Sequence, residues 1–243
     1  MLKNFRYTFF NTVVSTNDEC IKQALAGDPG GLWVVASRQT GGRGRRGRVW
    51  TSEPGNLYAS LLLVDSLSKQ SLTLLSFAIA VAVHSLIASF LPMGADIKIK
   101  WPNDLLICRR KVSGVLIETL DLKNGLQAVI IGIGINIKSC PDNTLYPVTS
   151  LAQEGVCVDL KDVLSKLYQE IAKILAIWRR DTGRKEIMSL WRCYASGIGD
   201  AITVNLPHQS LSGRFVGIDD FGYLLLEESK GCFRQVFTGD IIE

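Results

Sequence analysis

Apolar residues in the first 140 positions of the chain fall into short blocks separated by turn residues. Six blocks have the length of a strand and are rich in branched or aromatic side chains. They span residues 31–37, 56–64, 96–101, 104–108, 112–120 and 127–137. Tight turns such as Asn124-Gly125 join several of these blocks, so the pattern predicts a largely antiparallel sheet.

Four segments have the pattern of helices. Thr16 and Glu19 form a capping-box pair that predicts the start of a short helix, and Gly27 is its expected end. The apolar run 72–91 contains three serines and a histidine, which favours a helix buried against the sheet over a membrane span. A further helix face is formed by apolar residues at positions 160, 163, 164, 167, 171, 174, 175 and 178. The last helix is predicted over 184–194.

The chain beyond residue 195 has a different texture. Short strand-like blocks alternate with turns at Asp220 to Gly222 and at Lys230-Gly231, which predicts a small barrel of about five strands. We therefore expect a mixed α/β (α+β) fold in two domains, residues 1–195 and residues 196–243.

Charge is unevenly distributed. The segment 38–48 holds five arginines and no acidic residue, so the rest of the chain, whose total is +4, is close to neutral at −1. One basic loop on a neutral protein favours a small anionic ligand over a long polyanion. The cysteines form no C-x-x-C pair and there are two histidines, so the sequence supports neither a zinc site nor a disulfide framework. The polar N-terminal segment lacks a signal-peptide core, and we expect a cytoplasmic protein.

The basic loop, RQTGGRGRRGRVW at 38–50, has a composition suited to anion binding. Its glycines allow a ligand to approach the backbone, its guanidinium groups match carboxylate and phosphate oxygens, and Trp50 offers a flat face to a purine. It is not a phosphate-binding Walker loop, because the G-x-x-x-x-G-K-[ST] pattern is absent. A flexible solvated loop explains the same composition.

Three further motifs carry polar groups, and each also has a purely structural explanation. In KWPND, Asn103 and Asp104 follow a proline turn and could hold hydrated Mg²⁺ with Lys111 nearby, although P-N-D is also a common turn sequence. GIGIN, residues 132–136, fits a bulged strand or a strand that approaches a ligand. STN, residues 15–17, fits a helix cap or a polar ligand site at the helix N-terminus.

In this order, the four motifs resemble those of the biotin protein ligases. The match runs from STN through Gln39 to Trp50, KWPND, the segment 110–118 and GIGIN to the C-terminal barrel. The resemblance implies a catalytic domain related to class II aminoacyl-tRNA synthetases and lipoate ligases, followed by a small Src-homology-3-like barrel. It also implies biotin and ATP as substrates, Mg²⁺, and activation of biotin to biotinyl-5'-adenylate before transfer to a carrier lysine.

The resemblance also assigns roles to individual residues. Arg48 and Lys111 would be catalytic, and Asp104 would contact Mg²⁺. Biotin would be bound by Ser15, Thr16, Asn17, Gln39, Gly42, Arg43, Gly44, Arg45, Lys111, Gly114, Leu116, Gly132 and Gly134. ATP or the adenylate would be bound by Arg45, Arg46, Arg48, Trp50, Asn103, Lys111 and Asn136. The loop 40–50 is expected to be poorly ordered until ligand binds.

The expected partners follow from the same resemblance. They are the biotin carboxyl carrier protein of a biotin-dependent carboxylase and, by analogy, a second copy in a homodimer; neither DNA nor a membrane is expected. Because STN lies so near the start, we expect a monofunctional ligase without an N-terminal DNA-binding domain. Two alternatives remain: a lipoate-protein ligase with the same adenylate chemistry, and a non-catalytic nucleic-acid-binding module.

Overall fold

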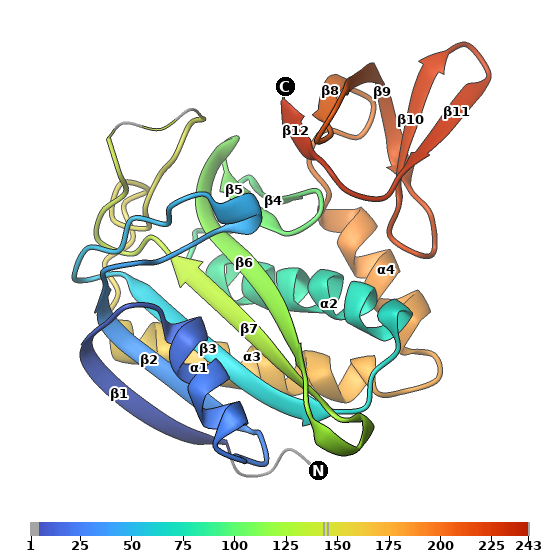
Figure 1. Ribbon diagram of the computed structural model, residues 1–243. Coiled ribbons are helices and arrows are strands. Elements are labelled where there is room, and N and C mark those ends of the chain that lie inside the picture. The colour runs from blue at the N-terminus through green and yellow to red at the C-terminus, as the bar shows by residue number, and fades with distance from the viewer. Residues whose placement is uncertain (1–4, 143, 145, 243) are drawn as a thin grey trace.

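The described part of the chain contains two β-sheets and four α-helices (Figure 1). The computed structural model describes residues 5–142, 144 and 146–242. The larger sheet has the order β1-β2-β3-β7-β6-β5-β4. Its strands are β1 (Arg6–Val13), β2 (Leu32–Gln39), β3 (Leu57–Asp65), β4 (Ile97–Lys100), β5 (Asp104–Ile107), β6 (Arg110–Asp121) and β7 (Gln127–Ile135). The helices are α1 (Thr16–Leu25), α2 (Lys69–Ala88), α3 (Leu160–Trp178) and α4 (Gly183–Tyr194), with short 3₁₀ turns η1 (Arg45–Gly47) and η2 (Lys123–Gly125). All six predicted strands of this sheet are present.

The edge strand β1 was not predicted. It pairs in parallel with β2 through the α1 crossover, whereas every other pairing in the sheet is antiparallel. Most of its side chains are exposed, so it lacks the alternation that marks a half-buried strand. The prediction of a mixed, largely antiparallel sheet is confirmed.

The start of α1 differs from the predicted capping box. Ser15 is the N-cap, and its hydroxyl accepts a hydrogen bond from the Asn17 N–H at 3.2 Å. Thr16 is already inside the helix, and its N–H donates to Gln39 on β2. Gly27 follows the helix with φ of 90°, as expected for a C-terminal stop. The shift by one residue directs the Thr16 and Asn17 side chains toward the sheet rather than toward their own backbone.

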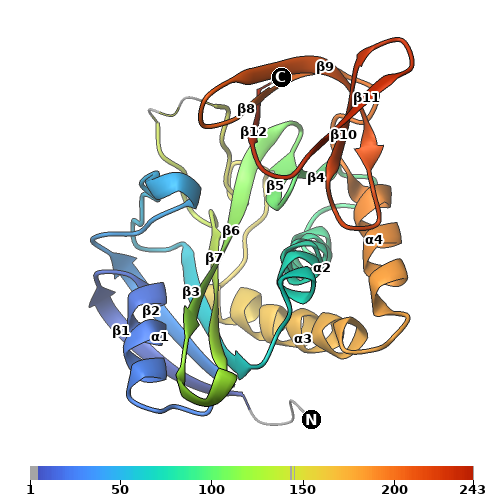
Figure 2. The ribbon, with the colours of Figure 1, turned by 45° about the vertical axis from the view of Figure 1, so that its right-hand side comes forward.

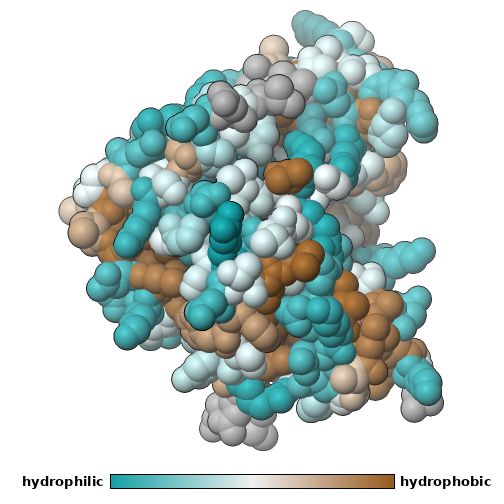
Figure 3. Space-filling model, turned by 60° about the vertical axis from the view of Figure 1, so that its left-hand side comes forward, coloured by the Kyte–Doolittle hydropathy of each residue, from teal (hydrophilic) through white to brown (hydrophobic). Residues whose placement is uncertain are grey.

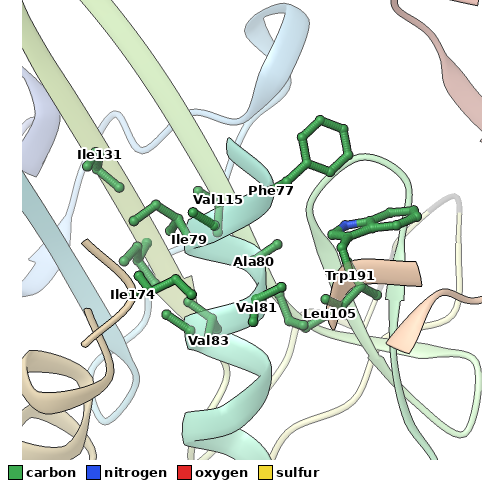
Figure 4. Close-up of a cluster of buried hydrophobic side chains, with 14 of the residues drawn as sticks. Phe77, Ile79, Ala80, Val81, Val83, Leu105, Val115, Ile131, Ile174 and Trp191 are labelled. Atoms are coloured by element: carbon green, nitrogen blue, oxygen red, sulfur yellow. The ribbon is translucent and has the colours of Figure 1, made fainter. Parts of the chain in front are cut away.

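Helix α2 is the centre of the core. Figure 2 shows it with α3 on one side of the sheet, while α1 covers the other. Its side chains contact the sheet around Val115 and Ile131, α3 at Ile174 and α4 at Trp191 (Figure 4). Phe77 and Trp191 meet edge to face, 5.4 Å apart. The helix has the length and apolar composition of a membrane span, but 67% of its most apolar window is buried inside the protein. This agrees with the predicted core helix.

The C-terminal sheet has the order β11-β10-β9-β8-β12 and is antiparallel throughout. Its strands are β8 (Ala201–Asn205), β9 (Ser210–Ile218), β10 (Leu224–Ser229), β11 (Cys232–Val236) and β12 (Asp240–Ile242). The expected boundary between residues 195 and 196 lies in the connection from α4 to β8. The Trp101 indole N–H donates to the Gly222 carbonyl at 3.0 Å, so this sheet rests directly on the first one.

Candidate functional site

One cavity lies on the α1 side of the large sheet, with about 660 Å³ of empty space including its open mouth. Side chains alternate between the two faces of each strand, so Ile131 packs toward α2 while Gly132 and Gly134 face the cavity. Gly114 and Gly134 are direct partners across β6 and β7, and Leu116 is the partner of Gly132. The floor of the cavity is therefore largely backbone.

Close neighbours explain the glycines of this floor. A Cβ on Gly132 would lie 2.4 Å from Asn17 Oδ1, and a Cβ on Gly134 would lie 2.5 Å from the Trp50 ring. A Cβ on Gly114 would meet the same ring at 3.0 Å. Larger residues would push both side chains out of place, so the glycines seat Asn17 and Trp50 against the sheet.

The end of the cavity beside α1 is a network of neutral polar groups. Gln39 Oε1 accepts from the Thr16 N–H at 2.8 Å, and the Gln39 amide donates to the Ser52 hydroxyl at 3.0 Å. The buried Ser60 hydroxyl lies 2.7 Å from the Thr16 hydroxyl and 2.5 Å from Asn17 Oδ1. Because each polar group has a partner, this end is held rigidly while remaining able to bind a polar, uncharged ligand.

A charged cluster closes the outer side of that network. The Asn17 amide donates to Glu118 at 2.6 Å, and Glu118 also pairs with Arg43 at 2.9 Å. Arg43 reaches Asp18 on α1 at 2.8 Å, and the hydrogen bond to Asp18 raises the pKa of Arg43. Arg43 thus fastens the start of the basic loop to both α1 and β6.

The other end of the cavity is built around Lys111. Its ammonium group pairs with Asp104 at 2.7 Å across β5 and β6, and only 12% of the side chain is exposed. The ring of Trp50 lies 5.4 Å from the ammonium nitrogen and that of Tyr146 lies 5.3 Å from it. The amine is consequently held between two aromatic rings, with its charge directed toward the cavity.

The basic loop forms a hairpin over the cavity. The Trp50 N–H donates to the Gly42 carbonyl at 2.9 Å and the Gly44 N–H to the Arg48 carbonyl at 2.7 Å. A Cβ on Gly42 would lie 2.6 Å from the Trp50 carbonyl, so only glycine fits there. Arg45 lines the cavity; burial lowers its pKa, while the Asp240 and Asp104 carboxylates act in the opposite direction.

Most residues that sequence assigned to the site line this single cavity. They are Ser15, Thr16, Asn17, Gln39, Arg43, Gly44, Arg45, Arg48, Trp50, Asp104, Lys111, Gly114, Leu116, Gly132 and Gly134. Gly42 lies at the base of the loop. Asn136 lines an adjoining hollow shared with Arg48, Trp50 and Lys111, and its own amide donates to the Thr149 carbonyl.

Two of the assigned residues point elsewhere. The Asn103 amide is buried, donating to the Ser76 hydroxyl and the Val115 carbonyl, each at 3.1 Å. Asp104, the next residue, instead pairs with Lys111 at the cavity, so Asn103 and Asp104 do not face a common Mg²⁺ site as expected. Arg46 faces the C-terminal sheet, where it bonds to the Asn205 carbonyl and Asp240.

Sequence reasoning missed four residues of the site. Ser60 and Tyr146 belong to no motif, and Asp240 lies almost 200 residues from the loop that it contacts. Glu118 is the last residue of the segment 110–118, and a charged residue within an apolar strand could have indicated that it belongs to the site.

The donor set suits a Mg²⁺ ion that arrives with nucleotide phosphates. Asp104 is the only carboxylate among the described residues that line the cavity, and within the described part of the chain no three His, Cys, Asp or Glu side chains cluster. Mg²⁺ is commonly bound through one or two carboxylates plus substrate phosphates. Asp104 fits that single contact.

The two ends of the cavity together define its chemistry. Arg45, Arg48 and Lys111 surround one end with a single carboxylate, Asp104, among them, which favours anionic groups. The other end offers neutral donors and acceptors. A ligand with a neutral polar head and an anionic tail that is joined to a phosphate matches both ends of the cavity.

Comparison with known proteins agrees with this geometry. Residues 11–136 match the Biotin/lipoate A/B protein ligase family, and residues 197–242 match the Biotin protein ligase C terminal domain. A biotin–[acetyl-CoA-carboxylase] ligase of Paracoccus denitrificans is 36% identical over 91% of this chain and 93% of its own length. A protein of the same name from Mycobacterium tuberculosis is 30% identical over 94% and 85%, respectively.

The fold has a counterpart among solved structures. The biotin protein ligase from Aquifex aeolicus in complex with biotin and ATP matches with a TM-score of 0.81 and 27% identity, covering 98% of this chain and 97% of that one. Fold, motifs and cavity lead to the same conclusion. The chain belongs to the biotin protein ligases of the biotin/lipoate A/B protein ligase family.

Proposed function

We propose that the chain is an ATP-dependent biotin–[acetyl-CoA-carboxylase] ligase. It activates biotin to biotinyl-5'-adenylate and transfers the biotinyl group to a specific lysine of a biotin carboxyl carrier domain. The observation that supports this function most strongly is the single cavity with a neutral hydrogen-bonding end and a cationic end. Biotin has a neutral ureido ring and a carboxylate at opposite ends, and ATP supplies the phosphates.

In the first half-reaction, a biotin carboxylate oxygen attacks the α-phosphorus of ATP and the bond to pyrophosphate breaks. Two anions must meet, so neutralisation and positioning supply most of the rate gain. Lys111 and Arg48 would stabilise the charge that builds up on the α-phosphate. Asp104 orients Lys111 and would contact the Mg²⁺ that accompanies the nucleotide. The ureido ring would bind to Ser15, Thr16, Asn17 and Gln39.

In the second half-reaction, the carrier lysine amine attacks the acyl carbon of the mixed anhydride. An amide forms, the amine loses a proton and AMP leaves. The adenylate reacts with water, so the hairpin 42–50 would cover it until the carrier arrives. Trp50 and Asn136, beside the hollow next to Lys111, are placed for the adenosine part.

We also propose a cytoplasmic homodimer. Strand β1 leaves one edge of the large sheet unpaired, with Tyr7 66% and Phe9 51% exposed. Figure 3, turned to bring this side forward, shows hydrophobic residues among hydrophilic ones. An unpaired edge can accept the same strand of a second copy. Sedimentation equilibrium should show a dimer that Phe9→Lys weakens.

Neither alternative function is favoured. A nucleic-acid-binding module needs a basic face open to solvent, whereas Arg43, Arg46 and Arg48 are paired with carboxylates. A lipoate ligase shares the adenylate chemistry, but lipoate has no ureido ring to use the network around Gln39.

Biotin-dependent exchange of radiolabelled pyrophosphate into ATP tests the proposal. Exchange with biotin, but not with lipoate or octanoate, is expected. Exchange with lipoate alone would assign the chain to the sister activity, and a salt-dependent gel shift with duplex DNA without any exchange would support the binding module.

A further inference from the structure

The C-terminal sheet supplies the partners of three arginines in the basic loop. Arg48 Nη2 donates to Asp240 Oδ1 at 2.9 Å, and Arg46 Nη1 donates to Asp240 Oδ2 at 3.1 Å. Arg45 Nη2 donates to the Gly239 carbonyl at 3.1 Å. Both oxygens of one carboxylate are therefore engaged by two guanidinium groups of the same loop.

Asp240 is held in place by the backbone of its own sheet. It begins β12, where it pairs with Asn205 of β8. The preceding Gly239 lies so close to β8 that a Cβ would come within 2.4 Å of the Val204 side chain, which is buried. A larger residue at 239 would push β12 away, so the close approach of the two strands fixes where the carboxylate lies.

The loop has little else to hold its arginine-rich tip. Besides the cross-strand bond from Gly44, the turn is closed by two long bonds, each 3.3 Å, from the Arg48 backbone N–H and from Arg48 Nε to the Arg45 carbonyl. Arg46 has a left-handed backbone, with φ of 57°, which costs a non-glycine residue about 1 kcal/mol. Flexible glycines add an entropic cost of ordering. The contacts with Asp240 offset these costs.

Asp240 also faces the reacting groups. A second hollow between the two sheets, with about 530 Å³ of empty space, is lined by Arg45, Arg48, Asp104, Lys111 and Asp240, among others. Within the described part of the chain, the bonds of Arg48 use Nε and Nη2. A guanidinium group has five N–H donors, so the side chain that Asp240 holds can still donate from Nη1 to a phosphate oxygen.

We propose that Asp240 is a positioning residue for adenylate formation, which rests on the function proposed above. It closes the basic loop before the nucleotide binds, by holding Arg46 and Arg48 against the C-terminal sheet. The nucleotide then meets arginines that are already in place, and the cost of ordering the loop does not reduce its affinity. The C-terminal domain thereby contributes to a site whose other groups lie in the first domain.

Trypsin offers a direct test, because it cleaves after arginine and the loop presents Arg45, Arg46 and Arg48. Asp240→Asn keeps the size of the side chain but turns an amide N–H₂ toward one of the two guanidinium groups. We expect tryptic cleavage within 45–48, with biotin present but no nucleotide, to become about fivefold faster. Asp240→Glu, which keeps both oxygens and the charge, should restore most of the protection.

Asp200 provides the matched control. It pairs with Arg109 at 3.0 Å, also between the two domains, but does not touch the loop. Asp200→Asn should leave the loop cleavage unchanged. Equal cleavage of the Asp240→Asn and unaltered proteins would overturn the proposal, and so would equal acceleration by both variants.

Steady-state pyrophosphate exchange separates positioning from competition. If Asp240 positions the loop, Asp240→Asn should raise KM for ATP about fivefold with little change in KM for biotin. If Asp240 merely occupies the place of a phosphate, the variant should lower KM for ATP, and the proposal fails. The proteolysis does not require enzyme activity, so it tests the loop contact independently of the proposed function. If the protein shows no biotin-dependent exchange but Asp240→Asn still accelerates loop cleavage, the loop contact is supported and the proposed function is refuted.

Discussion

The two ends of the cavity are built in different ways. At the neutral end, Thr16, Asn17, Gln39 and Ser60 belong to one domain, are mostly buried and bond to each other. At the cationic end, Arg46 and Arg48 lie on a loop, are partly exposed and rely on Asp240 from the second domain. A neutral head group is costly to bury without preformed partners, whereas charges act at longer range and tolerate a loop that moves. The comparison indicates that rigidity provides specificity at one end and that charge provides the chemistry at the other.

The largest effect should follow from removing charge at the cationic end. Lys111→Met keeps the stem between the two aromatic rings but removes the ammonium group. We expect biotin-dependent pyrophosphate exchange to fall by a factor of about 10³, typical of losing a group that stabilises transition-state charge. Lys161→Met, on an exposed position of α3, should leave exchange unchanged. Normal exchange by Lys111→Met would remove this residue from the chemistry.

Acidification should lower the stability of the first domain, which carries most residues of both ends of the cavity. Burial lowers the pKa of His84 to about 4, and its ring stacks on Tyr194, 3.8 Å away. The unfolded chain, with a pKa near 6.5, binds the proton more readily, so stability is full above pH 6.5 and declines as the pH falls toward 4. We expect a loss of up to about 3 kcal/mol in the free energy of unfolding, measured by urea denaturation.

His84→Leu should remove most of this pH dependence. The exposed His208→Gln should retain it. If the two variants lost stability equally on acidification, His84 would not be the responsible group.

Substitutions of the two β7 glycines in the cavity floor, which flank Ile133, should affect the two ends of the cavity separately. Gly132→Ala places a Cβ against Asn17 and should raise KM for biotin about tenfold, since overpacking typically costs 1–3 kcal/mol. Gly134→Ala displaces the Trp50 ring instead and should act mainly on KM for ATP. Isothermal titration with each substrate provides an independent reading. The same response from both variants would mean that the two ends are not separable.

The smallest effect should come from the charged cluster beside the neutral end. Glu118→Gln weakens the pairing with Arg43 while leaving an acceptor for the Asn17 amide. Both charged side chains are about a third exposed, so solvent screens the pair and a two- to fivefold rise in KM for biotin is expected. A rise larger than that for Gly132→Ala would contradict this ranking.

Sequence predicted the parts of the molecule that depend on local pattern. The strand around Ile131 and the helix around Phe77 are apolar runs of the length expected for a strand and a helix, and tight turns predicted the antiparallel order of the strands. Most motif residues meet in one cavity because they lie at the start of α1, in the basic loop or on the same face of neighbouring strands. Strand β1 was not predicted because most of its side chains are exposed, so its sequence does not alternate between apolar and polar residues.

Contacts between distant segments could not be predicted in this way. Ser60 looks like any serine in an apolar strand until its register places it beside Asn17. Asp240 was one of many surface acids, and only the docking of the C-terminal sheet brings it to Arg48. Asn103 shows the converse case, since its motif suggested a ligand while the start of β5 turns its amide into the core.

A crystal structure with a non-hydrolysable biotinyl-adenylate analogue tests the account of two distinct ends most directly. The account predicts the ureido ring against Gly132, within hydrogen-bond reach of Asn17 and Gln39, and the phosphate beside Lys111 and Arg48. An analogue bound in the reverse orientation, or outside this cavity, would contradict it.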